Sequence, residues 1–293
     1  MLLERAQART GGGYMLGLMP LVDEPLRRAG VWEEYRDRSM TMRRYRLSSS
    51  HGREVRTYSF DAVLCAYGRY GGIERGELIQ VMSGGSLPVS FGTSVGYVGQ
   101  DELGAAVGIN TADGLIDARF DLVIAADGMH STTRDLVVDA GDVEEFDTGW
   151  GGWVVWADAN PTQSDLYAET WGRGFFIVRY PLRDKVGVFL RGPRTATAVG
   201  PAAFGCSARK RLSRVDESNA QAFSAIGAAR GPTIGSFLTP VATAGHREGQ
   251  CSLGTRRPTS FPRQASARPW RWNRQRYWPR SSVVSAQPVS KSR

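Results

Sequence analysis

Apolar and polar residues alternate along two parts of the chain, and this pattern predicts β-strands there. Residues 43–60 form two short alternating runs around the turn-like segment 48–52, as a hairpin does. Residues 174–190 repeat the pattern, with aromatic and β-branched side chains on either side of a turn at 181–185. Shorter strand-like runs separated by glycine occupy 86–125. We therefore expect antiparallel β-structure in the later part of the chain.

Other parts have the spacing of a helix or of a buried strand. Apolar residues recur at helical intervals over 16–35, and a second helix is predicted to start within 74–82. Residues 120–126 form a continuous apolar run, as expected of a strand buried on both faces of a sheet. An Asp-Gly pair follows, and then a helix-like segment from Ser131. The predicted fold class is α/β, with a nucleotide-binding part followed by an antiparallel sheet.

The net charge of the chain comes from its last part. The 293 residues carry a net charge of +8 and are 41% hydrophobic, which suits one large globular domain or two ordinary ones. Residues 246–293 contain 11 Lys and Arg and a single acidic residue, so the first 245 residues have a net charge of −2. The excess of basic residues therefore lies in the last 48 residues, and it gives no reason to expect that the first 245 residues bind nucleic acid.

Cysteine usage and hydropathy indicate a cytoplasmic protein. The three cysteines are widely spaced and the three histidines are scattered, so no metal site is predicted and free thiols in a reducing compartment are expected. No apolar run approaches the roughly 20 residues that span a bilayer. The first residues also lack the apolar core of a signal peptide. We expect no membrane partner.

The most specific motif directly follows the apolar run. Residues 125–134, Ala-Ala-Asp-Gly-Met-His-Ser-Thr-Thr-Arg, resemble the Asp-Gly motif of FAD-dependent aromatic-ring monooxygenases of the para-hydroxybenzoate hydroxylase type. In that family the motif lies near the FAD pyrophosphate and is implicated in binding FAD and NAD(P)H. The resemblance implies that Asp127, Gly128, Ser131 and Arg134 bind the cofactor. Glycine allows close backbone approach, and a helix start offers N–H groups to phosphate. An Asp-Gly pair alone would fit an ordinary strand–turn–helix connection with a serine cap.

Two further segments resemble the same family. Glu4, followed by Arg5, resembles the acidic residue that ends the second strand and hydrogen-bonds the adenosine ribose. The glycines at 11–13 then resemble the next turn of the family. Arg75, three residues before Leu78, resembles an Arg-x-x-Leu whose arginine contacts FAD. Taken alone, these residues also fit a solvated terminal carboxylate and a surface arginine in the first turn of a helix.

The resemblance implies an FAD-dependent monooxygenase with a Rossmann-like FAD-binding domain and an antiparallel substrate-domain sheet. NAD(P)H would reduce FAD, and O₂ would then give a peroxyflavin that oxygenates a small organic substrate, aromatic or otherwise electron-rich. The flavin supplies this chemistry, so no catalytic acid, base or nucleophile is assigned. Residues 180–182, Tyr-Pro-Leu, resemble the sheet beneath the flavin ring, and its aromatic residues are expected to be core.

Two elements of the family pattern have no match in the sequence. A G-x-G-x-x-G fingerprint is expected about 20 residues before the acidic residue, but only three residues precede Glu4. The family also has a Gly-Asp motif late in its sequence, which holds the ribityl and pyrophosphate parts of FAD, and this chain has no such motif. We therefore expect an N-terminally truncated copy of the fold that has little or no bound FAD and is impaired.

The end of the chain has an unusual composition. The 45 residues after Glu248 contain no Asp or Glu and are rich in Arg, Ser, Pro and Trp. With GC-leaning codons, residues 264–273 shifted by two bases give Gly-Val-Gly-Ala-Ser-Met-Ala-Met-Glu, which resembles the family's helix after the late motif. We hypothesise that the reading frame changes after about residue 200–225. The predicted organisation is a partial FAD-binding domain with inserted strands (1–140), an antiparallel substrate-domain sheet (141–205), and a disordered or out-of-frame tail (206–293).

Two alternative functions are compatible with the sequence. One is another FAD-dependent oxidoreductase, such as a halogenase-like or reductase-like flavoprotein. The other is a non-enzymatic remnant whose Arg- and Trp-rich tail binds nucleic acid or an acidic membrane surface. A change of frame explains the tail without a function, so a nucleic-acid partner is not expected. The sequence does not indicate the oligomeric state.

Overall fold

The computed structural model describes residues 1–9, 13–84, 88–101, 104–128, 130–140, 143–228, 236–242, 246–247 and 250–252. All of these fall within one compact unit, Met1–Arg256. Gly11, Gly12 and Met129 lie outside the described residues. So do residues 253–293, and with them most of the basic tail and the predicted out-of-frame segment.

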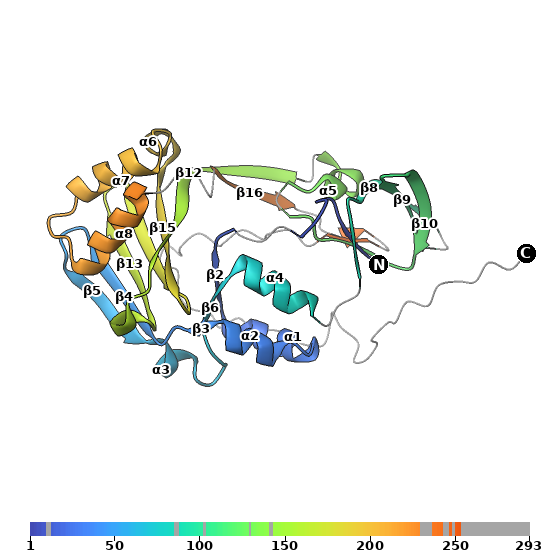
Figure 1. Ribbon diagram of the computed structural model, residues 1–293. Coiled ribbons are helices and arrows are strands. Elements are labelled where there is room, and N and C mark those ends of the chain that lie inside the picture. The colour runs from blue at the N-terminus through green and yellow to red at the C-terminus, as the bar shows by residue number, and fades with distance from the viewer. Residues whose placement is uncertain are drawn as a thin grey trace, which may run out of the picture. The chain divides into compact units, whose positions relative to one another are not determined.

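The largest sheet has seven strands in the order β16-β12-β15-β14-β13-β4-β5 (Figure 1). Neighbouring strands are antiparallel except β13 and β4, which run parallel. Both hairpins predicted from alternation are confirmed: β4 pairs with β5, and β14 pairs with β15. The strands are β4 (Arg44–Ser49), β5 (Glu54–Ser59), β12 (Val143–Asp158), β13 (Leu166–Gly172), β14 (Phe175–Pro181), β15 (Lys185–Pro193) and β16 (Ser236–Ala242).

Helices cover one face of this sheet, as Figure 1 shows. They are α6 (Arg194–Thr197), α7 (Pro201–Lys210) and α8 (Glu217–Ala228). Phe204 of α7 and Ile226 of α8 are fully buried against Leu190 and the other inward-facing residues of the sheet. Burial of such large apolar side chains is the main favourable contribution to folding here. The predicted boundary at residue 206 therefore falls inside α7, and ordered core continues through α8.

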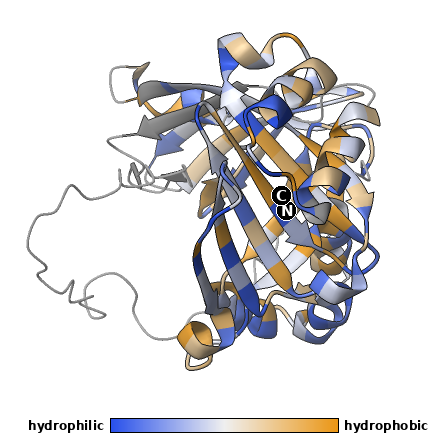
Figure 2. Cartoon of the chain, turned by 90° about the vertical axis from the view of Figure 1, so that its left-hand side faces the viewer, coloured by the Kyte–Doolittle hydropathy of each residue, from blue (hydrophilic) through white to orange (hydrophobic). Residues whose placement is uncertain are grey.

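The opposite face of the sheet carries an aromatic cluster. Tyr45, Phe60, Tyr70, Tyr167 and Tyr180 pack with ring centroids 4.8–6.1 Å apart. Apolar and polar residues alternate along the strands, as the hydropathy colours of Figure 2 show, because successive side chains point to opposite faces of a sheet. Most of the aromatic residues in this cluster are half-buried or buried, as expected for core.

A three-stranded sheet, β2-β6-β3, holds the segment that leads to Arg75. The predicted helix over 16–35 is only partly correct. Its first residues form strand β2, and Gly30, with a φ of 73°, separates two short helices. Proline at residues 20 and 25 favours helix starts rather than a continuous helix. The elements are β2 (Met15–Leu18), η1 (Pro20–Val22), α1 (Asp23–Arg28), α2 (Trp32–Arg38), β3 (Met40–Thr41), α3 (Phe60–Leu64), β6 (Gly71–Glu74) and α4 (Arg75–Ser83).

Three smaller sheets surround the predicted cofactor motif. An antiparallel meander has the order β10-β9-β8, a parallel pair joins β1 to β7, and a third sheet has the order β11-β18-β17. Helix α5 packs against β8. The elements are β1 (Leu2–Glu4), β7 (Val89–Phe91), β8 (Ser94–Asp101), β9 (Gly104–Thr111), β10 (Gly114–Phe120), β11 (Val123–Ala125), α5 (Thr132–Val137), η3 (Pro161–Gln163), β17 (His246–Arg247) and β18 (Gln250–Ser252).

One expectation for this region is wrong. Strand β11 pairs parallel with β18, but it is not buried on both faces. Leu122 and Ile124 are 55% and 57% exposed. The prediction assumed cover on both faces of the strand, and among the described elements β11 lies at the edge of its sheet with a single strand partner.

Candidate functional site

The Asp127 loop connects β11 to α5 through a compact set of hydrogen bonds. The Ser131 hydroxyl and the Thr133 backbone N–H, at 3.0 Å, both donate to the Asp127 carboxylate. The Ser131 oxygen in turn accepts the Arg134 backbone N–H at 2.9 Å and forms the N-cap of α5. Two of the N–H groups that a helix start leaves without partners are thereby satisfied. The motif thus shapes its own loop before any ligand is considered.

These hydrogen bonds stabilise the ionised form of the Asp127 carboxylate. Burial by itself raises the pKa of the Asp127 carboxyl, but the hydrogen bonds from Ser131 and Thr133 outweigh it and lower the pKa below its ordinary value. Both donors are buried, Ser131 at 5% and Thr133 at 7% exposed, whereas Asp127 itself is exposed. The carboxylate therefore remains ionised at neutral pH.

Gly128 supplies the sharp turn after Asp127. Its φ of 87° lies in the region that side chains rarely adopt, and no atom lies within 4 Å of the position that a Cβ would occupy. The glycine is thus required by backbone conformation, and the space beside it is open to a ligand.

The loop borders a cavity of about 360 Å³ that also contains Glu4 and Arg5. Two sequence-predicted cofactor residues from the start of the chain therefore meet Asp127 at one site. The cavity is lined by residues 1–5, 93–95, 107, 120, 122–127 and 132–133. The volume lies at the lower end of the range of about 300–1,000 Å³ typical of small-molecule sites, so it suits part of a dinucleotide.

Glu4 ends strand β1 as the sequence predicted. Its Oε1 accepts the backbone N–H of Ala6 at 2.8 Å, and its backbone oxygen accepts the Thr93 N–H at 3.1 Å. These bonds hold the turn after β1 against the segment after β7. An exposed carboxylate at the end of a strand in a parallel pair is where dinucleotide-binding folds place their ribose acceptor.

The motif residues divide into those that line the cavity and those that support it. Asp127 borders the cavity, while Gly128, Ser131 and Arg134 are outside its lining. The Arg134 side chain is 12% exposed, with its Nε 3.5 Å from Asp135. Thr132 and Thr133 line the cavity instead, together with Thr93 and Ser94. No feature of the sequence predicted these hydroxyls to line a site, although Thr132 and Thr133 lie within the motif, between Ser131 and Arg134.

Arg75 is not brought to this cavity. It begins α4 as predicted, its backbone N–H donates to the Tyr14 backbone oxygen at 2.9 Å, and its side chain lies along Gly13. The preceding residue, Glu74, pairs with Lys185 at 2.6 Å, which ties this point to the β14–β15 hairpin. Among the residues that the structure describes, Arg75 thus contacts Gly13 and Tyr14 and does not line the cavity that Glu4 and Asp127 border.

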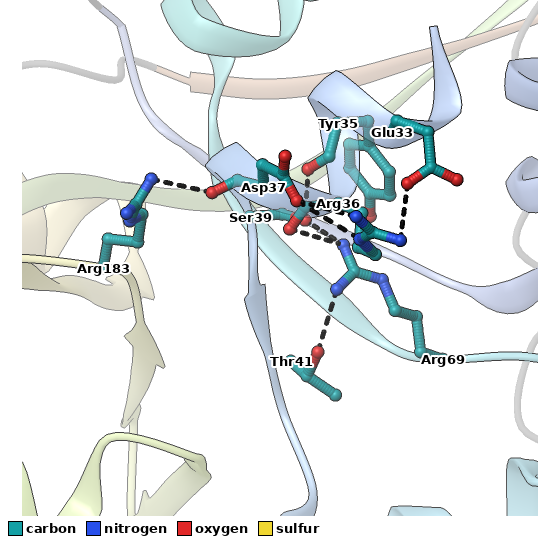
Figure 3. Close-up of polar contacts among 8 residues, drawn as sticks. All are labelled: Glu33, Tyr35, Arg36, Asp37, Ser39, Thr41, Arg69 and Arg183. Carbon is teal, nitrogen blue, oxygen red and sulfur yellow. Dashed lines mark hydrogen bonds and ion pairs between the residues drawn. The ribbon is translucent and has the colours of Figure 1, made fainter.

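A polar cluster fixes the segment before β6, as drawn in Figure 3. The Arg69 guanidinium donates to Thr41 at 2.9 Å and to the Ser39 hydroxyl, and it lies 5.0 Å from the Tyr35 ring centroid. Arg183 reaches the same region by donating to the Asp37 backbone oxygen at 2.7 Å. The cluster joins α2 to the loop before β6 and to the β14–β15 hairpin. These contacts hold the three segments together, and none of the residues of the cluster lines the cavity.

Asp23 lies beside this polar cluster and is buried, at 3% exposed. Burial raises the pKa of its carboxyl, although the Arg69 backbone N–H and the charges of Arg27 and Arg69 oppose that effect. The side chain fits under Gly68, where a Cβ would lie 2.2 Å from the Asp23 Oδ2. Asp23 therefore fixes the position of the loop before β6 through its contacts with Gly68 and Arg69.

Two other site classes receive no support from the described residues. No three His, Cys, Asp or Glu side chains gather there as metal ligands. In the same part of the chain, no helix has the length and apolar character needed to cross a bilayer.

Comparison with known proteins identifies the fold. No protein-family model matches the chain, and no curated protein matches it in sequence. Solved structures do match. They include a variant of HpxO from Klebsiella pneumoniae in complex with FAD (TM-score 0.68, 18% identity, 86% of this chain and 66% of HpxO). They also include PqsL from Pseudomonas aeruginosa, described as a probable FAD-dependent monooxygenase (TM-score 0.67, 20% identity, 86% and 70%). The tetracycline destructase Tet(51) matches with a TM-score of 0.55 at 16% identity (87% and 67%).

The match covers most of this chain but a smaller share of the other proteins. The chain spans about two thirds of the length of these structures. At identities of 20% or less, these matches show similarity of fold. By that measure the chain has the α/β fold of the FAD-dependent aromatic-ring monooxygenases.

Proposed function

We propose that the chain is an FAD-dependent monooxygenase that uses NAD(P)H and O₂ to oxygenate a small organic substrate, aromatic or otherwise electron-rich. The observation that carries this proposal is the meeting of Glu4 and Asp127 at one cavity, although the two residues are far apart in the sequence. The fold supports it, because HpxO was solved with FAD bound. Fold alone does not establish a reaction, so the site residues must be tested directly.

The residues at the cavity suit the ribose and phosphate part of FAD. The exposed Glu4 carboxylate can accept hydrogen bonds from ribose hydroxyls, and Arg5 brings a positive charge next to it. The hydroxyls of Ser94 and Thr132 can donate to phosphate oxygens. Asp127, held by Ser131 and Thr133, keeps the loop in place at the border of the cavity.

FAD supplies the redox and oxygen chemistry when it is bound, and the protein binds and orients it. We expect the chain by itself to bind FAD weakly. Its cavity of about 360 Å³ has room for part of a dinucleotide, and Arg75 lies outside the cavity lining. A cofactor held at few points loses affinity, because ordering it costs translational and rotational freedom.

The proposal is tested by titrating FAD with the protein and following flavin fluorescence. Glu4→Gln and Asp127→Asn should each weaken binding by about tenfold, because each removes a charged hydrogen-bond acceptor from the ligand or its loop. Asp121→Asn is the matched control, since Asp121 is an exposed aspartate near the same strand but outside the cavity lining. FAD affinity that neither site variant changes would contradict the assignment.

Monooxygenation itself needs a second measurement. The protein, saturated with FAD and supplied with NADH or NADPH, is incubated with a panel of phenols and aminobenzoates under isotopically labelled O₂. One labelled oxygen in a product is expected. NAD(P)H oxidation that yields hydrogen peroxide with every substrate and no labelled product would favour another class of FAD-dependent oxidoreductase.

A further inference from the structure

Several exposed cations gather at one end of the seven-stranded sheet. Strand β13 pairs parallel with β4, with Trp171 beside Ser49, so the turns that follow these two strands lie next to each other. The segment after α7 joins them, because the Ser213 backbone N–H donates to the Ser50 backbone oxygen at 2.9 Å. These three segments form one surface, which we call the basic end: residues 50–56, 172–175 and 209–216.

Two arginines of the basic end are held in place by the other segments. The Arg211 guanidinium donates to the Arg173 backbone oxygen and to the Ser207 hydroxyl, each at 3.2 Å. The Arg214 side chain packs on Gly52, where an added Cβ would lie 3.0 Å from the Arg214 Cβ. These contacts join the three segments and restrict the directions of two exposed arginine side chains.

The basic end has a charge opposite to that of the sequence around it. Its three segments contain seven Lys and Arg and two acidic residues, a net charge of +5, whereas the first 245 residues together carry −2. The remainder of the first 245 residues therefore carries −7. Both acidic residues have partners: Glu54 lies 3.6 Å from the Arg46 Nε, and Asp216 accepts the Asn219 backbone N–H at 2.7 Å. The seven cations are all exposed: Arg53, Arg56, Arg173, Arg209, Lys210, Arg211 and Arg214.

None of these seven cations is in an ion pair with another residue that the structure describes, whereas the exposed Arg28 and Arg119 are. The last turn of α7 accounts for two of them, because Arg209 and Lys210 there complement the helix dipole. The others bring like charges together, which opposes the compact state. Residues 246–293 contain a single acidic residue, so we expect the complementary charge to come from another molecule.

We propose that the basic end is a docking surface for an acidic segment of a partner protein, rich in Asp and Glu. Guanidinium groups that are held in place suit carboxylates, because the planar group can donate two parallel hydrogen bonds to one carboxylate. Recognition of acidic motifs by clusters of arginine is an established mode of peptide binding. None of the residues of the basic end lines the cavity at Glu4 and Asp127, so this inference does not rest on the proposed FAD function.

The test uses the full chain without FAD and a fluorescein-labelled peptide of five Asp-Glu repeats. Fluorescence anisotropy should show saturable binding. The affinity should fall at least about tenfold when the salt concentration rises from about 0.05 M to about 0.5 M, because salt screens exposed charges. A control peptide with Asn and Gln in place of Asp and Glu should not bind. Equal affinity of the two peptides, or no saturable binding of the acidic one, would overturn the proposal.

A matched pair of double variants locates the binding site, because residues 246–293 are themselves basic. Arg211→Gln with Arg214→Gln removes two charges from the basic end and should weaken peptide binding at least about tenfold. Arg271→Gln with Arg274→Gln removes the same charge at the same spacing and should change the affinity by less than about twofold. Arg211 and Arg214 are exposed, so their variant should keep the wild-type far-ultraviolet circular dichroism. Equal losses of affinity in the two double variants would refute the assignment.

Modification of arginine by phenylglyoxal, read by mass spectrometry, maps the contact in the wild-type chain without any substitution. Bound acidic peptide should slow the modification of Arg173, Arg211 and Arg214. It should leave the modification of Arg28 and Arg119 unchanged, since both are exposed and lie outside the basic end. Protection confined to arginines of residues 246–293 would overturn the proposal.

Other anions distinguish the alternative partners. Phosphatidylserine vesicles or an oligouridylate that bind with the same dependence on Arg211 and Arg214, where the acidic peptide does not bind, would replace the protein partner with a lipid surface or a nucleic acid. Self-association that the Arg211 and Arg214 double variant abolishes, without peptide binding, would assign the basic end to a second copy. All of these measurements are made without FAD, so a failure of the FAD proposal leaves them readable.

Discussion

Replacing Asp127 with asparagine tests whether the motif builds its own loop. The carboxylate accepts two hydrogen bonds, from the Ser131 hydroxyl and the Thr133 N–H. Asparagine keeps the shape but has one acceptor oxygen, and its amide nitrogen cannot accept. One buried donor, Ser131 or Thr133, is then left without this partner. Hydrogen bonds to charged groups contribute about 1.5–3 kcal/mol, and the exposure of Asp127 reduces that through solvent screening. We expect a loss of about 1–2 kcal/mol in the free energy of unfolding at pH 7.

The pH dependence of this loss has a definite sign. The pKa of Asp127 in the folded protein is lowered from an ordinary value of 3.8. Its contribution to stability is therefore fully present above the unfolded pKa and is lost as the pH falls through the folded pKa. Asparagine binds no proton in this range. The difference between wild type and variant should be constant from about pH 7 to pH 5 and should shrink below about pH 4.

Urea unfolding followed by tryptophan fluorescence measures both quantities, with Asp121→Asn as the control for an exposed aspartate outside the loop. The control should change the free energy of unfolding by less than about 0.5 kcal/mol. Equal stability of Asp127→Asn and wild type at pH 7 would refute the argument, as would a difference that stays constant down to about pH 3.

Three further substitutions probe the surrounding structure by the same unfolding assay. Phe204→Ala should cost about 3–5 kcal/mol, because it opens a cavity in the core beneath α7; a cost below about 1 kcal/mol would mean that α7 is not packed there. Gly128→Ala should cost about 1–2 kcal/mol from its positive φ alone, since no neighbour clashes, and Gly128→Asn should cost less. Arg69→Met should cost about 1–3 kcal/mol through the lost bonds to Ser39 and Thr41. Arg28→Met, at an exposed ion pair, should be nearly neutral. An equal loss of unfolding free energy at Arg69 and Arg28 would show that the polar cluster around Arg69 does not stabilise the fold.

Elements whose causes lie within a few neighbouring residues were predictable from the amino-acid sequence. Alternation predicted both hairpins, since strand and turn signals lie within a few residues of each other. The segment 120–134 predicted a strand, a glycine turn and a helix from Ser131, and each is present because the hydrogen bonds of the motif stay within the loop. Periodicity failed over 16–35, where two prolines and a glycine break the helix that the apolar spacing indicates.

Which distant residues share a site depends on the three-dimensional fold. It brought Glu4 and Arg5 to the Asp127 loop and left Arg75 outside the cavity, because strand pairing across long stretches of sequence sets those positions. It also showed Leu122 and Ile124 exposed, where the apolar run by itself indicates burial. An apolar pattern indicates that a strand is stable when other elements pack on both of its faces. Whether it is buried depends on which elements the fold places there.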